Sequence, residues 1–163
     1  MRNERNNPTL LPSIIDRLGA PTGTGGRVAL EGQSAAELKR SVARDLEWLL
    51  NTRVWTPWNL DALEEASRSI LNYGIPELSG FSWASADDAR SIKSLIETAI
   101  RTFEPRLLPR SIKTEVLPAQ DVADFTLRIR IEAILHVDPI SEPVVFDTGL
   151  DFDGGGLRVE RFE

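Results

Sequence analysis

The sequence predicts an α+β domain in which two main helices pack on an antiparallel sheet of three to four strands. Apolar residues recur at helical spacing in two stretches before residue 104, and after that point they alternate with polar residues at the period of a strand. Helices followed by a run of strands are typical of the α+β class, in which the helices cover the apolar face of the sheet. A chain of 163 residues has room for one such domain and a tail.

The first main helix is expected to begin after Ser34 and to end near Asn51. Ser34 and Glu37 have the spacing of a capping box, in which the side chain of each residue accepts a hydrogen bond from the backbone of the other. An apolar stripe at helical spacing then consists of Leu38, Val42, Leu46 and Leu49. This stripe is expected to face the core.

The second main helix is expected to begin after Ser85, its N-cap, and to end near Glu104, because Pro105 cannot continue a helix. Its buried face is expected to consist of Ala89, Ile92, Leu95, Ile96, Ala99, Ile100 and Phe103. Between the two helices, residues 61–71 show a weaker helical or mixed pattern, and residues 73–76 interrupt any regular element.

The strands are expected after Pro105. The clearest pattern covers residues 125–137, where apolar residues alternate with mostly polar ones, so that one face belongs to the core and the other is mostly wet. Its neighbours are expected at 112–117 and 144–150, with 157–162 as a final edge strand. These strands form the predicted antiparallel sheet.

Residues 1–33 are expected to form a flexible segment ahead of a domain at 34–163. Glycine and proline are concentrated in residues 19–33, which is typical of a linker. A short helix is predicted over about residues 11–18, and its apolar stripe consists of Leu11, Ile14, Ile15 and Leu18. Because two helical turns are not stable alone in water, the stripe must pack on its own domain or in a groove of a partner.

Glu104-Pro105-Arg106-Leu107 is the most informative local feature, because it stands where the helical pattern gives way to the strand pattern. Glu104 is expected at the negative end of the helix dipole, where a nearby cation should compensate it. The candidates are Arg101, Arg106 and Arg110. Two interpretations follow: a structural corner held by a carboxylate–arginine pair, or a fixed pair that is presented to a partner chain.

A second candidate contact region is Val144-Val145-Phe146. This run is β-prone, and the preceding Pro143 is unsuited to a central strand, so the run is predicted at or near an edge of the sheet. Residues 157–162 are the other candidate edge. An unpaired edge accepts an extended segment of another chain by strand addition.

Most catalytic chemistry is missing from the sequence. There is no cysteine, which excludes disulfides, thiolate catalysis and cysteine-ligated zinc, and His136, the one histidine, is expected on the wet face of its strand. Neither a phosphate-binding glycine motif nor a complete calcium loop is present, so no cofactor or metal is expected. Glu104 with Asp147 or Asp151 is a candidate carboxylate pair of a glycosidase, if the fold brings them together.

Charge and hydropathy restrict partners and location. A net charge of −6 argues against nonspecific binding to nucleic acid or to anionic lipid. No apolar run approaches the roughly 20 residues that a bilayer-spanning helix needs, and the first residues lack the apolar stretch of a signal peptide. We therefore expect a cytoplasmic protein without direct membrane insertion.

Four sequence blocks stand out along the chain: LPSIIDRL at 11–18, DLEWLLNTR at 45–53, SILNYGIPEL at 69–78 and FEPRL at 103–107. They resemble, in content and order, the blocks seen in TssE, the lysozyme-like baseplate wedge subunit of the bacterial type VI secretion system, which is similar to a wedge protein of contractile-tailed phages. Together they span most of the chain.

The resemblance implies a structural component without hydrolytic activity. Members of the family join a wedge complex with TssF, TssG and TssK, and they present a sheet edge on which the contractile sheath of TssB and TssC begins to assemble. The candidate contact residues are then Glu104, Pro105, Arg106 and Leu107, the stripe on 11–18, and the run from Val144 to Phe146. The alternatives are a peptidoglycan hydrolase or other glycosidase, and a small adaptor that binds a regulator.

Overall fold

The computed structural model describes most of the chain from Ser34 onward. The described residues are 34–54, 63–78, 80–81, 85–117, 126–137, 140–151 and 156–162. The predicted helix at 11–18 and the predicted linker at 19–33 lie outside them.

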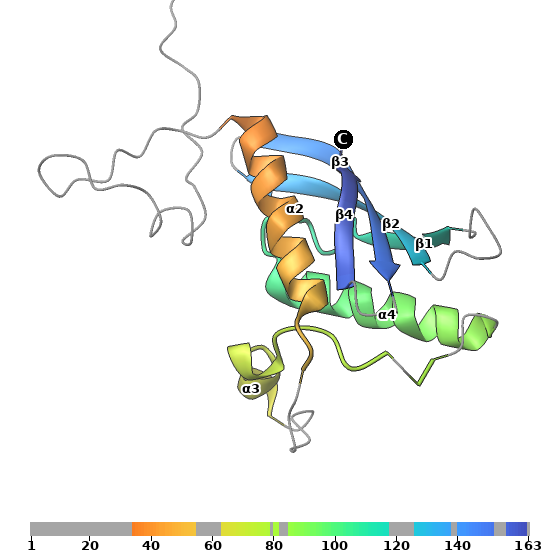
Figure 1. Ribbon diagram of the computed structural model, residues 1–163. Coiled ribbons are helices and arrows are strands. Elements are labelled where there is room, and N and C mark those ends of the chain that lie inside the picture. Colours follow the sequence, from red (N-terminus) through yellow and green to blue (C-terminus); the bar gives the residue numbers. More distant parts are fainter. Residues whose placement is uncertain are drawn as a thin grey trace, which may run out of the picture.

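Within these residues two long helices and two short helical turns precede a four-stranded sheet (Figure 1). The helical elements are α2 (Ala35–Asn51), α3 (Glu64–Ser67), the 3-10 turn η1 (Ile70–Asn72) and α4 (Ala86–Phe103). The strands are β1 (Lys113–Leu117), β2 (Thr126–Val137), β3 (Ile140–Asp151) and β4 (Gly156–Phe162). The sheet order is β1-β2-β3-β4 and each neighbouring pair is antiparallel, so the predicted α+β class is confirmed.

Both long helices begin at the caps that the sequence indicated. The hydroxyl of Ser34 accepts a hydrogen bond from the N–H of Glu37 at 3.3 Å, and the N–H of Ser34 donates to the Glu37 carboxylate at 2.7 Å. Ser85 caps α4 by accepting from the N–H of Asp88 at 3.3 Å. At the other end of α4, Pro105 follows directly after the C-cap Glu104, as predicted.

The core lies between one face of the sheet and the two long helices. α2 packs on β3 and β4, while α4 packs on β1 and on α2 (Figure 1). The predicted stripe of α2 is fully buried, and so are the inward residues Ile129, Ile131, Ala133 and Leu135 of β2. Their neighbours Glu132 and His136 are exposed on the outer face. The alternation therefore assigned the two faces of β2 correctly.

Most strand ends fall within one residue of the prediction, and two regions differ by more. β3 begins at Ile140 rather than at residue 144, because its pairing with β2 continues to Val137 opposite Ile140. The stretch at 61–71 contains one short turn of α-helix and one 3-10 turn, and neither has a buried residue. The weak periodicity of this stretch reflects this lack of a buried face.

Candidate functional site

The Glu104-Pro105-Arg106 corner is held by a bidentate ion pair. Glu104 is 4% exposed, and its carboxylate accepts hydrogen bonds from Arg106 Nε at 2.7 Å and from Arg106 Nη2 at 2.5 Å. The backbone N–H of Arg106 donates to the same carboxylate at 3.2 Å. Of the three arginines that could compensate Glu104, Arg106 does so, whereas Arg101 binds Glu97 at 2.8 Å.

The guanidinium of Arg106 also ties the corner to α2. Its Nη2 donates to Asp45 Oδ2 at 2.6 Å, and its Nη1 donates to the hydroxyl of the buried Ser41 at 3.2 Å. Burial disfavours the charged guanidinium and by itself would lower the Arg106 pKa. This effect is outweighed by the hydrogen bond with Glu104 and the charge of Glu104, and then by the same two contributions from Asp45. The Arg106 pKa is therefore raised above its ordinary value. The end of α4 and the middle of α2 thus share one charged cluster.

The backbone of the corner is hydrogen-bonded to the edge of β2 that faces away from β3. The N–H of His136 donates to the carbonyl of Arg106 at 2.8 Å, and the N–H of Leu108 donates to the carbonyl of Ile134 at 2.9 Å. Leu107 is fully buried, whereas Pro105 is exposed. The surface that the corner offers to another chain is therefore limited to Pro105 and the edge of the Arg106 side chain, which is 19% exposed.

Tyr73 links this corner to the 69–78 block. Its ring meets the ring of Phe103 edge-on, with 5.3 Å between the centroids. Burial raises the Tyr73 pKa, and the negative charges of Asp45 and Glu104 raise it further. A neutral phenol therefore lies beside the two carboxylates.

The same block pairs with the residues that follow α2. The N–H of Ile75 donates to the carbonyl of Thr52 at 2.9 Å, and the N–H of Val54 donates to the carbonyl of Ile75 at 3.0 Å. Gly74 has a φ of +120°, and a Cβ there would lie 2.3 Å from the Thr52 carbonyl oxygen. Only glycine fits this position without strain, because the backbone dihedral and the close approach both exclude a side chain.

Three of the four sequence blocks therefore converge on one region of the fold. Asp45 comes from the block at 45–53, Tyr73 from the block at 69–78, and Glu104 and Arg106 from the block at 103–107. Sequence analysis missed Asp45, Ser41 and Tyr73 as partners of the corner. A usable signal was the position of Ser41 and Asp45 beside the apolar stripe of α2, where a polar residue needs a partner.

The arrangement does not support the glycosidase pair suggested by the sequence. Glu104 is bound by Arg106 on the side of the sheet that carries α2, whereas Asp147 lies on the outer face and accepts hydrogen bonds from Arg130 Nε at 2.7 Å and Nη2 at 3.0 Å. The side chain of Asp151 lies outside the described residues. Among the described residues no group of three or more metal-binding side chains is found, and no described helix is long and apolar enough to cross a membrane.

The second candidate region, Val144-Val145-Phe146, lies in the third of the four strands. Val144 and Phe146 are buried in the core, and Val145 is half-buried on the outer face. Phe146 faces β2 on one side and Phe162 of β4 on the other, but in the described pairing the residues of β3 before Phe146 pair with β2 alone. The first half of β3 is thus a local edge, although β3 is an inner strand.

The direction of the backbone groups explains why Pro143 is tolerated. Ile134 directs its N–H and its carbonyl toward residues 108–111, away from β3, and Pro143 is its partner in β3. In an antiparallel ladder, the two residues of a pair that is not hydrogen-bonded both direct their backbone N–H and carbonyl groups away from each other. The missing N–H of Pro143 therefore falls on the unpaired side of β3. Val145, two residues on, directs its N–H to the same side.

Comparison with known proteins identifies the family. A family model described as baseplate wedge protein gp25 matches residues 36–140. Comparisons with curated proteins and with solved structures returned no match. The matched region includes α2 except its first residue, α4, the corner, and all of β1 and β2. Because it covers more than half of the chain and contains the three converging blocks, the chain belongs to the gp25 family of baseplate wedge proteins, whose role is structural.

Proposed function

We propose that this chain is a non-enzymatic wedge subunit of the type VI secretion baseplate. In this role it joins TssF, TssG and TssK, and its sheet edge is the template on which the sheath proteins TssB and TssC begin to assemble. Family membership over residues 36–140 carries the proposal. The four sequence blocks, which occur in the order seen in TssE, favour the type VI system over a phage tail. The proposed position of the baseplate is cytoplasmic.

The corner supports a structural role because its charges are already paired within the chain. Arg106 donates hydrogen bonds to the carboxylates of Glu104 and Asp45. In the described part of the site, neither carboxylate is therefore available as a nucleophile or general acid. Pro105 and the exposed edge of Arg106 form the part of the corner that we propose for contact with the wedge. A turnover assay on cell-wall material tests the hydrolase alternative, and hydrolysis that depends on Glu104 would contradict a purely structural role.

Two edges are proposed as templates for the sheath, the first half of β3 and the outer side of β4. Val145 directs its N–H to the unpaired side of β3. Val159 lies opposite Thr148, and the alternation from Ile134 along β2 and β3 places its N–H on the free side of β4. Strand addition at either edge needs these donors.

The experiment replaces Val145 or Val159 by proline, which removes the outward N–H while the neighbouring ladder bonds remain. The matched controls Val145→Thr and Val159→Thr keep the donor and the branched shape. Labelled sheath is imaged in a secreting bacterium, and co-purification of TssF, TssG and TssK reports whether the baseplate still forms. We expect a proline variant to form the wedge without extending a sheath, while the threonine variants behave as the parent chain. Normal sheath with both proline variants would exclude both edges, and failure to retain the wedge subunits from the parent chain would exclude the type VI assignment.

A further inference from the structure

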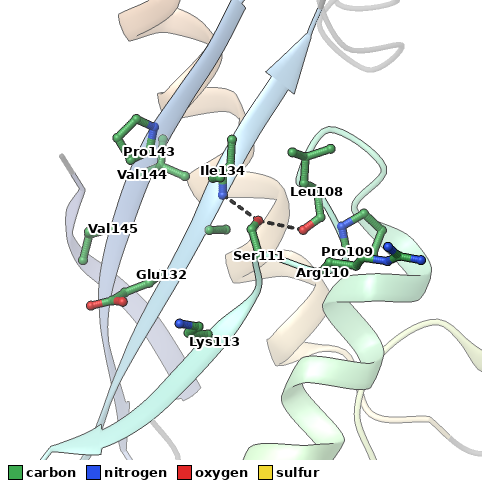
Figure 2. A pocket seen from close by; sticks show the side chains of 11 residues that line it. Leu108, Pro109, Arg110, Ser111, Lys113, Glu132, Ile134, Pro143, Val144 and Val145 are labelled. Carbon is green, nitrogen blue, oxygen red and sulfur yellow. Dashed lines mark hydrogen bonds between the residues drawn. The ribbon is translucent and has the colours of Figure 1, made fainter.

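A groove of about 950 Å³ lies on the outer face of the sheet, which the two long helices do not cover (Figure 2). Its apolar lining comes from the segment after the corner and from β2 and β3. These residues are Leu108, Pro109, Ile134, Pro143 and Val145. In Figure 2, Leu108 and Pro109 lie on one side of Ile134, and Pro143 and Val145 lie on the other.

The groove exists because residues 108–111 leave the ladder of β2. The hydroxyl of Ser111 accepts from the N–H of Ile134 at 2.8 Å and donates to the carbonyl of Leu108 at 2.7 Å (Figure 2). This single side chain replaces a strand partner, so the segment stands away from the sheet without leaving these backbone groups unpaired. The groove therefore offers apolar side-chain contacts, which suit an apolar helix face better than an added strand.

Charged side chains lie along part of the margin of this apolar surface. Arg110 and Lys113 belong to the side of β1, Glu132 lies on β2, and all three line the groove. Farther along the same face, Arg130 and Asp147 form a half-buried ion pair. An apolar patch with a charged rim is typical of a binding surface.

We propose that residues 11–18 of this same chain occupy the groove as a short helix. The stripe of Leu11, Ile14, Ile15 and Leu18 supplies one apolar face. On such a helix Arg17 lies on a flank of the stripe and Asp16 lies on the face opposite to it, because successive residues are 100° apart. Glu132 lines the groove, so one orientation of the helix brings the Arg17 guanidinium to this carboxylate.

The tether favours this occupant over one from another chain. Lys39, just over one turn into α2, forms an ion pair with Glu142 at 3.3 Å, and Glu142 directly precedes the groove residue Pro143. The chain thus enters α2 close to one end of the groove. Residues 19–33 can span roughly 50 Å when extended, which is ample for a return to the outer face. A flexible tether of this length gives an effective concentration in the millimolar range, so a weak intrinsic affinity suffices.

Because residues 1–163 contain no cysteine, disulfide trapping in the chain of residues 1–163 is a direct test. Ile15→Cys is combined in turn with Val145→Cys and with Leu108→Cys, one on each side of the groove. The matched control combines Ile15→Cys with Ser94→Cys, because Ser94 is exposed on α4, the helix that covers the inner face. Under mild oxidation of the purified chain, gel mobility separates intramolecular from intermolecular disulfides.

We expect at least one groove pair to give an intramolecular disulfide at a yield about tenfold above that of the Ser94 control, since docking raises the local concentration beyond that of a free tether. Ile14→Asp with Leu18→Asp should reduce this yield to the control level without touching the described domain. The proposal would be overturned by an unchanged yield in that variant or by equal yields at groove and control positions. Predominantly intermolecular disulfides would also overturn it, in favour of binding to a second copy of the chain. The test needs no baseplate partner, so its outcome is independent of the type VI assignment.

Discussion

Replacing Arg106 by alanine should destabilise the domain strongly, because it leaves Glu104 and Asp45 without their shared cation. Glu104 is 4% exposed, and the arginine provides three of its hydrogen bonds, two from the guanidinium and one from the backbone. Alanine keeps only the backbone bond. A buried carboxylate that loses its partner carries the full cost of its desolvation.

Breaking a buried ion pair by removing one partner costs about 3–5 kcal/mol. We take the lower end, about 3 kcal/mol, because the Arg106 side chain is 19% exposed and water can reach the vacated site in part. For a chain of 163 residues each kcal/mol lowers Tm by roughly 2–4 °C, so the expected fall in Tm is roughly 6–12 °C. The Tm of Arg106→Lys should lie between those of the parent chain and Arg106→Ala, since lysine keeps the charge and loses the bidentate geometry.

The matched control is Arg130→Ala. Arg130 forms a similarly bidentate pair with Asp147, but on the outer face and in contact with solvent, so screening leaves little net stabilisation. Thermal and urea unfolding of the two alanine variants compare a buried pair with a more exposed pair in one domain. Equal losses in the two variants would refute the argument that burial of Glu104 decides the effect. A fully folded Arg106→Ala domain that fails only in wedge assembly would favour the docking interpretation of the corner.

Two further predictions concern positions away from the corner. Gly74→Ala should cost at least about 2 kcal/mol in urea unfolding, because both its φ and the approach to the Thr52 carbonyl exclude a Cβ, whereas Gly80→Ala, with nothing within 4 Å, should be nearly neutral. Burial alone would raise the Glu97 pKa, but hydrogen bonds from Arg101 and Thr114 lower it below 4.5. The contribution of the Glu97 carboxylate to the free energy of unfolding is therefore present above pH 4.5 and is lost as the pH falls through the folded-state pKa. The stability gap between the parent chain and Glu97→Gln should therefore narrow from pH 7 to pH 3 in urea titrations, and a constant gap would contradict the shift.

Local pattern sufficed for the elements whose signals are local. The capping box of α2, the Ser85 cap of α4, the two apolar stripes and the alternation of β2 depend on residues within a few positions of one another, and the structure confirms them. The outcome at Pro105 follows from the geometry of proline alone. These features gave the fold class without knowledge of any tertiary contact.

The partners of the corner were out of reach for the same reason. Asp45 and Arg106 are 61 residues apart in sequence, and nothing in the local pattern of α2 selects Arg106 over other cations. The groove likewise depends on the Ser111 hydroxyl that replaces a ladder partner of Ile134. A serine in the turn before a strand is ordinary in sequence, and only the assembled sheet gives it this role.

Proline also ranks the two proposed edges. Along the free half of β3, Pro143 cannot donate to an added strand, so only Ser141 and Val145 offer outward N–H groups there. The edge of β4, from Gly156 to Phe162, contains no proline. Proline on an edge is a common defence against unwanted strand pairing. The free half of β3 is therefore a poor edge for strand addition, and a strand from another chain should pair mainly with β4. Val159→Pro should then reduce sheath assembly more than Val145→Pro.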